Sequence, residues 1–342
     1  MKKSLKIVSS LMIAGVLLTS CKSKMAVDKG SFSKGADVGW LPQMEATGYK
    51  FYDADGSQKD CLQLLKDRGI NTIRLRVWVN PNDDKASGHC SPEETVVMAV
   101  RAQKMGMRIM IDFHYSDSWA DPGKQNKPAA WAKHSFPELL TDVYQHTYDV
   151  LKLLKKAGVT PEWVQVGNEI PGGMLWPEGS TDNFGQLAQL LNKGYEATKA
   201  IDSKIKVIVH LDEGNKSEKF RWFFDKATEN KVKYDVIGLS YYPYWLKTDY
   251  KSTILDLENN MKDIASRYNK EVMVVEVGGD YTLVENTKEM LEATIKAVKN
   301  VPNNKGLGVI YWEPEGEKSW SGYQLNAWLP DGKPSPALDA FK

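Results

Sequence analysis

The stretch Trp163-Val164-Gln165-Val166-Gly167-Asn168-Glu169-Ile170 decides how this chain is interpreted. Its first four residues are mostly apolar and predict a short buried strand, which Gly167 ends. Glu169 follows directly, so its carboxylate lies just past the C-terminal end of the strand, where barrel enzymes carry catalytic groups. A single carboxylate after a strand is usually only solvated. The interpretation therefore depends on whether a second strand ends in the same way.

A second strand does end in this way. The run Val272-Met273-Val274-Val275-Glu276-Val277 is hydrophobic apart from its glutamate, and two glycines follow it. Two carboxylates at the same end of two barrel strands are the groups that a glycoside hydrolase needs. One protonates the leaving oxygen, and the other attacks the sugar carbon or activates a water. The pair predicts glycosidase chemistry.

The rest of the chain alternates between the two periodicities of strands and helices. The predicted strands are 35–40, 72–78, 107–112, 163–166, 206–211, 234–240, 272–277 and 306–312. Helical patterns cover 55–69, 92–106, 136–158, 182–201, 217–230, 253–268 and 286–299, with a short closing helix at 335–341. This alternation predicts an α/β fold with a parallel sheet and right-handed crossovers. Polar clusters confined to strand C-termini favour a (β/α)₈ TIM barrel in a single domain over an open doubly wound sheet.

Charged residues alternate with apolar ones in the strand 72–78. Arg74 and Arg76 share one face of it, because side chains alternate across a strand. The other face must pack on the helices, so the arginines are expected to point into the barrel, where they need carboxylate partners. A structural ion pair would explain one such arginine as well as a functional role does, but two on the same face favour a site.

The loop after the strand 107–112 is unusually rich in polar and aromatic residues. Asp112, His114, Asp117 and Trp119 lie within eight positions of one another, and Trp131 follows. A lone histidine is more often structural than catalytic, but two aspartates beside His114 favour a site. Aromatic faces are also surfaces on which sugar rings stack. We therefore expect this loop to contact a carbohydrate.

The N-terminal residues predict export. Basic residues and an apolar segment at 7–18 lead to Leu18-Thr19-Ser20-Cys21, which resembles a bacterial lipoprotein signal. An ordinary secretory signal cleaved nearby is the competing interpretation. The expected organisation is a signal peptide at 1–21, a tether at 22–33 and a catalytic domain at 34–342. The expected location is outside the cytoplasm, with Cys21 lipidated and anchored to a membrane, the outer membrane with exposure at the cell surface being favoured.

Composition limits the partners. The chain has 342 residues, 26% of them charged, and a formal net charge of +1, so nothing in its charge indicates nucleic acid as a partner. The length suits one large domain. Cys61 and Cys90 could pair outside the cytoplasm, and the sequence leaves open whether they do. It gives no firm indication of oligomeric state, and a monomer is the default expectation.

Several motifs together resemble glycoside hydrolase family 53, the endo-β-1,4-galactanases that cut type I arabinogalactan, the galactan side chains of pectin. The resemblance covers the chain from Gly35 onward. The motifs that carry it are 35–37, 74–81, 112–123, 166–170, 173–177, 240–243 and 311–314.

This resemblance implies a retaining hydrolase with Glu169 as acid/base and Glu276 as nucleophile, their carboxyl groups about 5–5.5 Å apart. Its partners would be galactan polysaccharide and galacto-oligosaccharides. Asn168 would bind the sugar 2-hydroxyl. The other residues expected to contact substrate are Arg74, Arg76, Asp112, His114, Asp117, Trp119, Trp131, Trp176, His210, Tyr241, Tyr242 and Trp312.

The sequence departs from the family pattern after Glu276. Many bacterial members carry a long calcium-binding insertion there, whereas this chain continues Val277-Gly278-Gly279-Asp280 into a predicted helix. We expect no calcium at that place, and no other metal or cofactor is implied. The segment after Trp312 also differs from the family pattern. Subsites remote from the cut are therefore expected to be altered.

Two alternatives remain open. Another retaining β-1,4-glycanase, of mannanase or cellulase type, would share the chemistry but not the family-specific loops. A non-catalytic surface glycan-binding protein would be expected to have lost a catalytic carboxylate, whereas this chain retains both Glu169 and Glu276.

Overall fold

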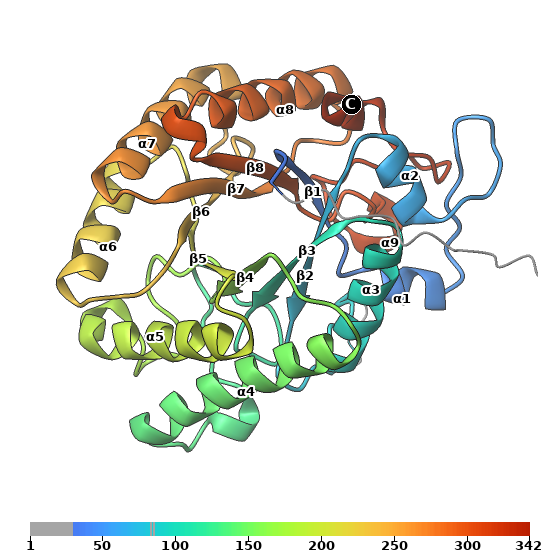
Figure 1. The fold of residues 1–342 in the computed structure, drawn as a ribbon. Helices are drawn as coiled ribbons and strands as arrows, with labels where there is room; N and C mark the ends of the chain where they lie inside the picture. The colour runs from blue at the N-terminus through green and yellow to red at the C-terminus, as the bar shows by residue number, and fades with distance from the viewer. Residues whose placement is uncertain (1–29, 83, 85) are drawn as a thin grey trace, which may run out of the picture.

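The computed structural model describes residues 30–82, 84 and 86–342. Eight parallel strands close into a barrel in sequential order, and helices form an outer ring around it (Figure 1). The strands are β1 (Ser33–Asp37), β2 (Thr72–Val77), β3 (Arg108–Phe113), β4 (Trp163–Val166), β5 (Lys206–Leu211), β6 (Val236–Tyr241), β7 (Glu271–Val277) and β8 (Gly306–Tyr311). The predicted (β/α)₈ TIM barrel in one domain is confirmed.

The α-helices follow the strands in alternation, with two small helices near the ends. They are α1 (Leu41–Ala46), α2 (Cys61–Asp67), α3 (Pro92–Lys104), α4 (Phe136–Lys156), α5 (Phe184–Ile201), α6 (Ser217–Glu229), α7 (Ile254–Arg267), α8 (Val284–Lys299) and α9 (Lys318–Ser321). Short 3₁₀ helices are η1 (Ala129–Trp131), η2 (Thr181–Asn183), η3 (Tyr250–Ser252), η4 (Pro302–Asn304) and η5 (Pro336–Phe341), the last forming the closing helix.

Two predicted element boundaries were wrong by several residues. The first strand ends at Asp37 instead of Trp40, because Leu41 begins α1 with a proline in its first turn. Helix α2, which was predicted to begin at Asp55, begins at Cys61. Asp60 caps it by accepting a hydrogen bond from the Gln63 amide at 3.1 Å, which ends the irregular segment before it. Strand β1 also begins at Ser33, one residue before the expected domain boundary. The signal peptide lies outside the described residues, as does most of the tether.

The barrel interior has two different layers. Its lower part is filled by a compact apolar group: Met110, Trp163, Ile208, Val236, Met273, Val275 and Ile310. A larger core joins the outer faces of the strands to the helices. Above the inner group, the register places Arg76 beside Asp112 and Asp112 beside Gln165. Polar side chains therefore meet inside the C-terminal end of the barrel, where active sites of this fold lie.

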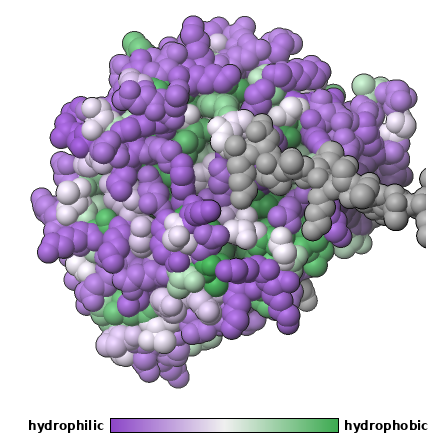
Figure 2. Space-filling model, in the orientation of Figure 1, coloured by the Kyte–Doolittle hydropathy of each residue, from purple (hydrophilic) through white to green (hydrophobic). Residues whose placement is uncertain are grey.

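The outer surface seen in one view is mostly polar. Figure 2 shows a face that is mostly hydrophilic, with hydrophobic residues scattered between polar ones. Within the part of the chain that the structure describes, no helix is long and apolar enough to cross a membrane.

Candidate active site

Glu169 and Glu276 line one cavity at the C-terminal end of the barrel. The cavity has a volume of about 240 Å³, and its wall also contains Asn168, His114 and Tyr242. Glu169 follows β4 and Glu276 belongs to β7, so the two carboxylates come from different strands and face the same space. We call this space the catalytic cavity.

Arg74 joins the carboxylates beneath the cavity. Its Nη2 lies 3.0 Å from Glu276 Oε1 and 2.8 Å from Asp112 Oδ2, and its Nη1 pairs with Asp37. The same Nη2 donates a hydrogen bond to Asn168 Oδ1 at 2.9 Å. The guanidinium is fully buried. Its charge therefore acts on these groups with little screening by water.

Glu276 is held through both of its oxygens. Oε1 faces Arg74, and Oε2 accepts a hydrogen bond from the Tyr242 hydroxyl at 3.1 Å. A cation and a hydroxyl donor both favour the ionised carboxylate. The contacts also fix the orientation of Glu276 toward the cavity.

Glu169 has a different environment. Its Oε1 accepts a hydrogen bond from the Ser240 hydroxyl at 2.5 Å, and no cation pairs with it among the described residues. Ser240 in turn lies 2.8 Å from His210 Nε2. The backbone amide of Glu169 and the side-chain amide of Gln165 both donate to His210 Nδ1, at 3.3 and 3.1 Å. His210 Nε2 must then carry the proton and donate it to Ser240, which leaves the Ser240 hydroxyl hydrogen for Glu169.

These environments separate the two carboxyl groups. Burial raises the pKa of Glu169 well above its ordinary value, and the nearby charge of Glu276 raises it further. Burial also raises the pKa of Glu276, to about 7, but Arg74 opposes this rise. Glu276 is therefore the group that ionises first, while Glu169 keeps its proton. One acid and one base next to one cavity are the requirement for general acid catalysis combined with a nucleophile.

Aromatic rings form one side of the cavity. Trp119, Trp312 and Tyr323 line it, and the ring centroids of Trp119 and Trp312 are 5.8 Å apart. Trp40 lies behind them, with its ring centroid 5.2 Å from that of Trp312. Trp119 and Trp312 are partly exposed and therefore offer apolar faces to a sugar ring.

Several residues expected to contact substrate lie behind the cavity wall instead. Arg76, Asp112 and His210 are almost completely buried and are not among the lining residues. Arg76 pairs with Glu313 and stacks under Trp119, with its guanidinium 4.4 Å from the ring centroid. Asp112 is paired with Arg74. These side chains support the lining groups, and their contact with substrate stays a prediction.

Four further residues that were expected to contact substrate do not line the catalytic cavity. Tyr241 points outward to Thr253, 2.9 Å from its hydroxyl, because adjacent strand residues face opposite sides. Asp117 accepts backbone hydrogen bonds from Asn80 and Ala129, which pins two loops together. These two side chains have structural contacts that explain their polarity.

Two of the expected tryptophans also pack within the protein instead of lining a cavity. Trp131 is 7% exposed, and its ring lies 6.0 Å from that of His146. Trp176 donates its indole hydrogen to the Gly172 carbonyl of its own loop at 2.8 Å. Neither ring belongs to the wall of the catalytic cavity.

The sequence interpretation missed four residues of the site: Gln165, Ser240, Trp245 and Tyr323. Gln165 and Ser240 could have been found, because each is a polar side chain at an inward position of an otherwise apolar strand. Tyr323 carries no such signal, since it reaches the cavity from a loop beyond α9.

Neither a metal cluster nor a disulfide occurs in the described part of the chain. No group of three or more His, Cys, Asp or Glu side chains there is arranged to hold a metal ion. Cys61 and Cys90 are both buried free thiols. The expected absence of calcium after Glu276 remains a prediction.

Comparison with known proteins identifies relatives along nearly the whole chain. The sequence model of Glycosyl hydrolase family 53 matches residues 33–338. The chain is 34% identical over 327 residues to the endo-β-1,4-galactanase of Bacillus subtilis (strain 168), covering 88% of this chain and 71% of that protein. It is 32% identical over 302 residues to the arabinogalactan endo-β-1,4-galactanase of Thermothelomyces thermophilus, covering 82% and 89%.

The structure has a similar relative. The Ignisphaera aggregans GH53 catalytic domain superimposes with a TM-score of 0.85 at 32% identity, covering 93% of this chain and 98% of that domain. The similarity therefore extends over nearly the whole barrel.

Proposed function

Because this chain belongs to glycosyl hydrolase family 53, we propose that it is an endo-acting hydrolase of β-1,4-galactan, with Glu169 as acid/base and Glu276 as nucleophile. The names of its relatives, an endo-β-1,4-galactanase and an arabinogalactan endo-β-1,4-galactanase, supply the substrate. The single observation that carries the chemistry is the pair of carboxylates on one cavity, of which only Glu276 is paired with a buried cation.

The first step is glycosylation of the enzyme. The Glu276 carboxylate attacks the anomeric carbon, and the bond from that carbon to the leaving oxygen breaks. Glu169 gives its proton to the leaving oxygen, so the departing sugar carries a neutral hydroxyl. The ester formed on Glu276 has lost the negative charge, while Arg74 stays neutralised by Asp112 and Asp37.

The second step releases the sugar. Glu169 is now ionised and takes a proton from a water molecule, whose oxygen attacks the same anomeric carbon. The ester bond breaks, Glu276 regains its charge beside Arg74, and Glu169 is again protonated. Two inversions at one carbon retain the β configuration. Asn168 lines the same cavity as the two carboxylates and is positioned by Arg74, which suits it to bind the 2-hydroxyl of the reacting sugar.

The aromatic side of the cavity suits the proposed substrate. Trp312 and Trp119 provide apolar faces beside Glu276, and their edge-on contacts with Trp40 hold them in place. A galactose ring has an apolar face that can stack on such a surface, while its hydroxyl groups face the polar side. A neutral sugar also needs no charged partner, in keeping with a chain whose formal net charge is +1.

The decisive experiment is hydrolysis of linear β-1,4-galactan by the protein from residue 22 onward. We expect galacto-oligosaccharides from the wild type and a loss of kcat by several orders of magnitude in Glu276→Gln and Glu169→Gln. Glu218→Gln, at an exposed position of α6, is the matched control and should be fully active. Proton NMR of the first product should show the β anomer.

Other outcomes would identify the alternatives. Cleavage of mannan or glucan but not galactan would retain the mechanism and refute the substrate. A first product with the α anomer would contradict the nucleophilic role of Glu276. Binding of galactan without any cleavage would make the protein a glycan-binding protein.

We also propose that the protein is exported, lipidated at Cys21 and held as a monomer at the outer membrane and cell surface. The support is the basic and apolar leader that ends at Cys21. Incorporation of labelled fatty acid into the wild type but not into Cys21→Ala is the expected result. Label in both proteins, or in neither, would refute the anchor.

A further inference from the structure

A large pocket lies outside the catalytic cavity, between the loops that follow β6 and β7. Its volume is about 680 Å³, within the range of small-molecule sites. We call it the outer pocket. Its residues are Pro243, Tyr244, Trp245, Lys247, Thr248, Asp249, Tyr250, Gly278, Gly279, Asp280, Leu283, Asn286 and Met290. The pocket is open because only residues 278–283 connect β7 to α8.

The outer pocket gathers exposed apolar side chains. Tyr244, Trp245 and Leu283 are 39%, 59% and 55% exposed, and they are three of the seven large hydrophobic residues exposed in the described chain. The rings of Tyr244 and Trp245 meet at 84°, with their centroids 4.8 Å apart. Such a concentration at one place marks a binding surface more often than a chance arrangement.

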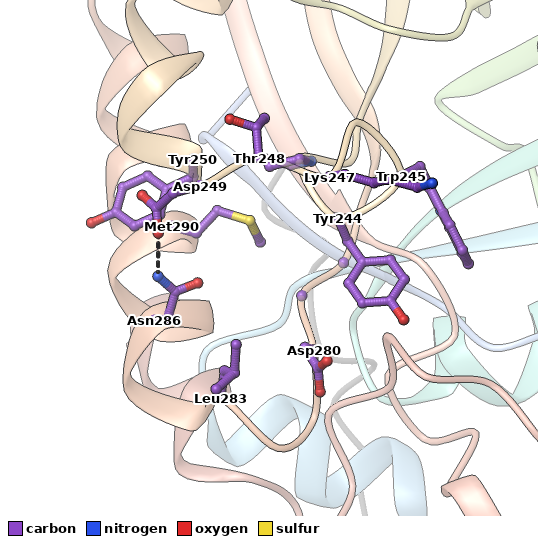
Figure 3. Close-up of a pocket in the computed structure, with 13 residues that line it drawn as sticks. Tyr244, Trp245, Lys247, Thr248, Asp249, Tyr250, Asp280, Leu283, Asn286 and Met290 are labelled. Atoms are coloured by element: carbon purple, nitrogen blue, oxygen red, sulfur yellow. Dashed lines mark hydrogen bonds between the residues drawn. The ribbon is translucent and has the colours of Figure 1, made fainter.

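Polar groups face the same opening. Figure 3 shows Asn286 on α8 bonded to Asp249, and Asp280 on the opposite side of the opening. Asp280 Oδ1 accepts hydrogen bonds from Thr282 and Gln324, whereas its Oδ2 has no partner among the residues that the structure describes. Asn286 Oδ1 and Lys247 Nζ are likewise without a partner there. These atoms can accept from, or donate to, hydroxyl groups of a ligand.

The charges of the pocket select against anions. Asp249 and Asp280 contribute two carboxylates, and Lys247 is the one basic side chain among the lining residues. Two carboxylates and one ammonium group disfavour a uronic acid or a phosphate. Aromatic faces together with free acceptors and a donor fit a neutral, hydroxyl-rich ring.

Trp245 connects the outer pocket with the site of the cut. It lines the outer pocket, the catalytic cavity and a third cavity of about 330 Å³ beside Glu169, Asp212 and Ser240. Glu169 lines both the catalytic cavity and the third cavity, so a glycan whose leaving oxygen lies at Glu169 can extend from one into the other. A glycan held at the carboxylates therefore passes Trp245 at the edge of the outer pocket.

We propose that the outer pocket binds a neutral glycosyl unit of the same polysaccharide, beyond the sugars held in the two cavities at the cut. The unit is either a further galactose of the main chain or a branch sugar such as arabinose. This inference rests on the proposed function for the identity of the glycan. In this proposal, the outer pocket increases the affinity for long or branched substrates and takes no part in bond cleavage.

The test uses three variants that leave the catalytic cavity lining unchanged. Tyr244→Ala removes a stacking face, Asn286→Ala removes a polar group from the opposite wall, and Leu283→Trp fills the opening. Trp222→Ala and Leu255→Trp are matched controls at exposed positions that do not line the pocket. The ring of Tyr244 contacts that of Trp245, so Tyr244→Ala could act by displacing Trp245. Asn286→Ala and Leu283→Trp, on the opposite wall, should therefore give the same result as Tyr244→Ala.

Kinetics are measured on linear galacto-oligosaccharides of increasing length and on arabinose-branched galactan. We expect KM to rise about three- to tenfold in all three variants, the equivalent of one aromatic contact. This rise should be absent for the shortest oligosaccharide that the wild type cleaves. A rise with long linear chains assigns the pocket to the main chain, and a rise with branched galactan alone assigns it to the branch. Unchanged KM on every substrate, or an equal loss on all lengths, would overturn the proposal.

Affinity electrophoresis through galactan separates this proposal from the proposed function. Carried out with the Glu276→Gln variant, it measures binding without cleavage. Weaker retardation after Leu283→Trp would support the pocket even if the wild type does not cleave galactan. Retardation that equals that of the parent, or no retardation of the parent itself, would refute it.

Discussion

Two side chains, one on β5 and one on β6, control the proton of Glu169. The backbone amide of Glu169 donates to His210 Nδ1, so the ring proton of His210 is on Nε2. Nε2 donates to the Ser240 hydroxyl, which in turn donates to Glu169 at 2.5 Å. This hydrogen bond lowers the pKa of Glu169, in opposition to burial, which raises it. Ser240 is therefore a positioning residue that limits how far the acid is shifted.

Ser240→Ala should move the basic limb of the kcat/KM profile to higher pH. The limb reports loss of the Glu169 proton, and removal of a donor to the charged form raises that pKa. One hydrogen bond of about 1 kcal/mol corresponds to somewhat less than about one pH unit. The profile of Ser203→Ala, an exposed serine, should coincide with that of the wild type. A shift to lower pH would contradict the direction of the hydrogen bond.

Arg74→Met should destabilise the fold by about 3–5 kcal/mol at pH 8, because it leaves buried carboxylates without a cation. Burial raises the pKa of Asp37 and of Glu276, each to about 7, above the values in the unfolded chain. Loss of Arg74 raises both further. Groups with raised pKa values weaken the folded state when they ionise, so the destabilisation should diminish as the pH falls to about 5.

Urea unfolding at the two pH values measures this difference. Arg221→Met, which breaks an exposed ion pair with Asp263, should change the unfolding free energy by about 1 kcal/mol or less at both. A destabilisation by Arg74→Met that does not depend on pH would show that the lost packing of the side chain dominates.

At the scale of elements, one carboxylate ties the loop after β8 to the turn after β1. Glu313 accepts hydrogen bonds from the amides of Gly39 and Trp40, at 2.9 and 3.0 Å, and pairs with Arg76. Trp40 contacts Trp312 and Trp119. The aromatic wall of the catalytic cavity is thus positioned by a buried group that lies outside it.

Glu313→Ala should therefore affect both stability and substrate binding. It removes the closest carboxylate partner of Arg76 and the acceptor of two backbone amides, for which we expect a loss of about 3–5 kcal/mol in urea unfolding. KM for galactan should rise more than kcat falls, because Glu169 and Glu276 keep their contacts. Glu292→Ala, at an exposed position of α8, is the control. A fall in kcat with unchanged KM would show that the contacts of Glu313 affect the chemical step instead of substrate binding.

At the scale of the whole molecule, the near-zero net charge predicts that activity depends little on salt concentration. A formal net charge of +1 produces little long-range attraction, and the proposed substrate is neutral. Raising the ionic strength to about 1 M, where the screening length falls to about 3 Å, should change kcat/KM on galactan by less than about twofold. A steep fall with salt would indicate a charged substrate and would contradict the neutral glycan.

The order of strands could be predicted from sequence because most buried strands are short apolar runs, and β2 alternates with a period of two residues. The same regularity placed Glu169, Glu276 and Arg74 at one end of the barrel before any coordinates were considered. Residues in loops were less predictable. Trp131 and Trp119 share the same connection, yet only Trp119 reaches the cavity, since tertiary packing alone decides which ring is covered. Tyr241 shows that strand alternation, applied more strictly, would have separated it from Tyr242.

The backbone of Glu169 has a φ of 42°, in the left-handed region that favours glycine. A residue with a side chain is strained there, and such strain tends to occur at functional positions. The proposed catalytic role gives a reason for a glutamate at a position where glycine or asparagine would relieve the backbone strain. In lineages of this family that come to use the barrel only for capturing glycans, drift should bring glycine or asparagine to this position early. A survey of such descendants would then show the acid/base lost before the nucleophile.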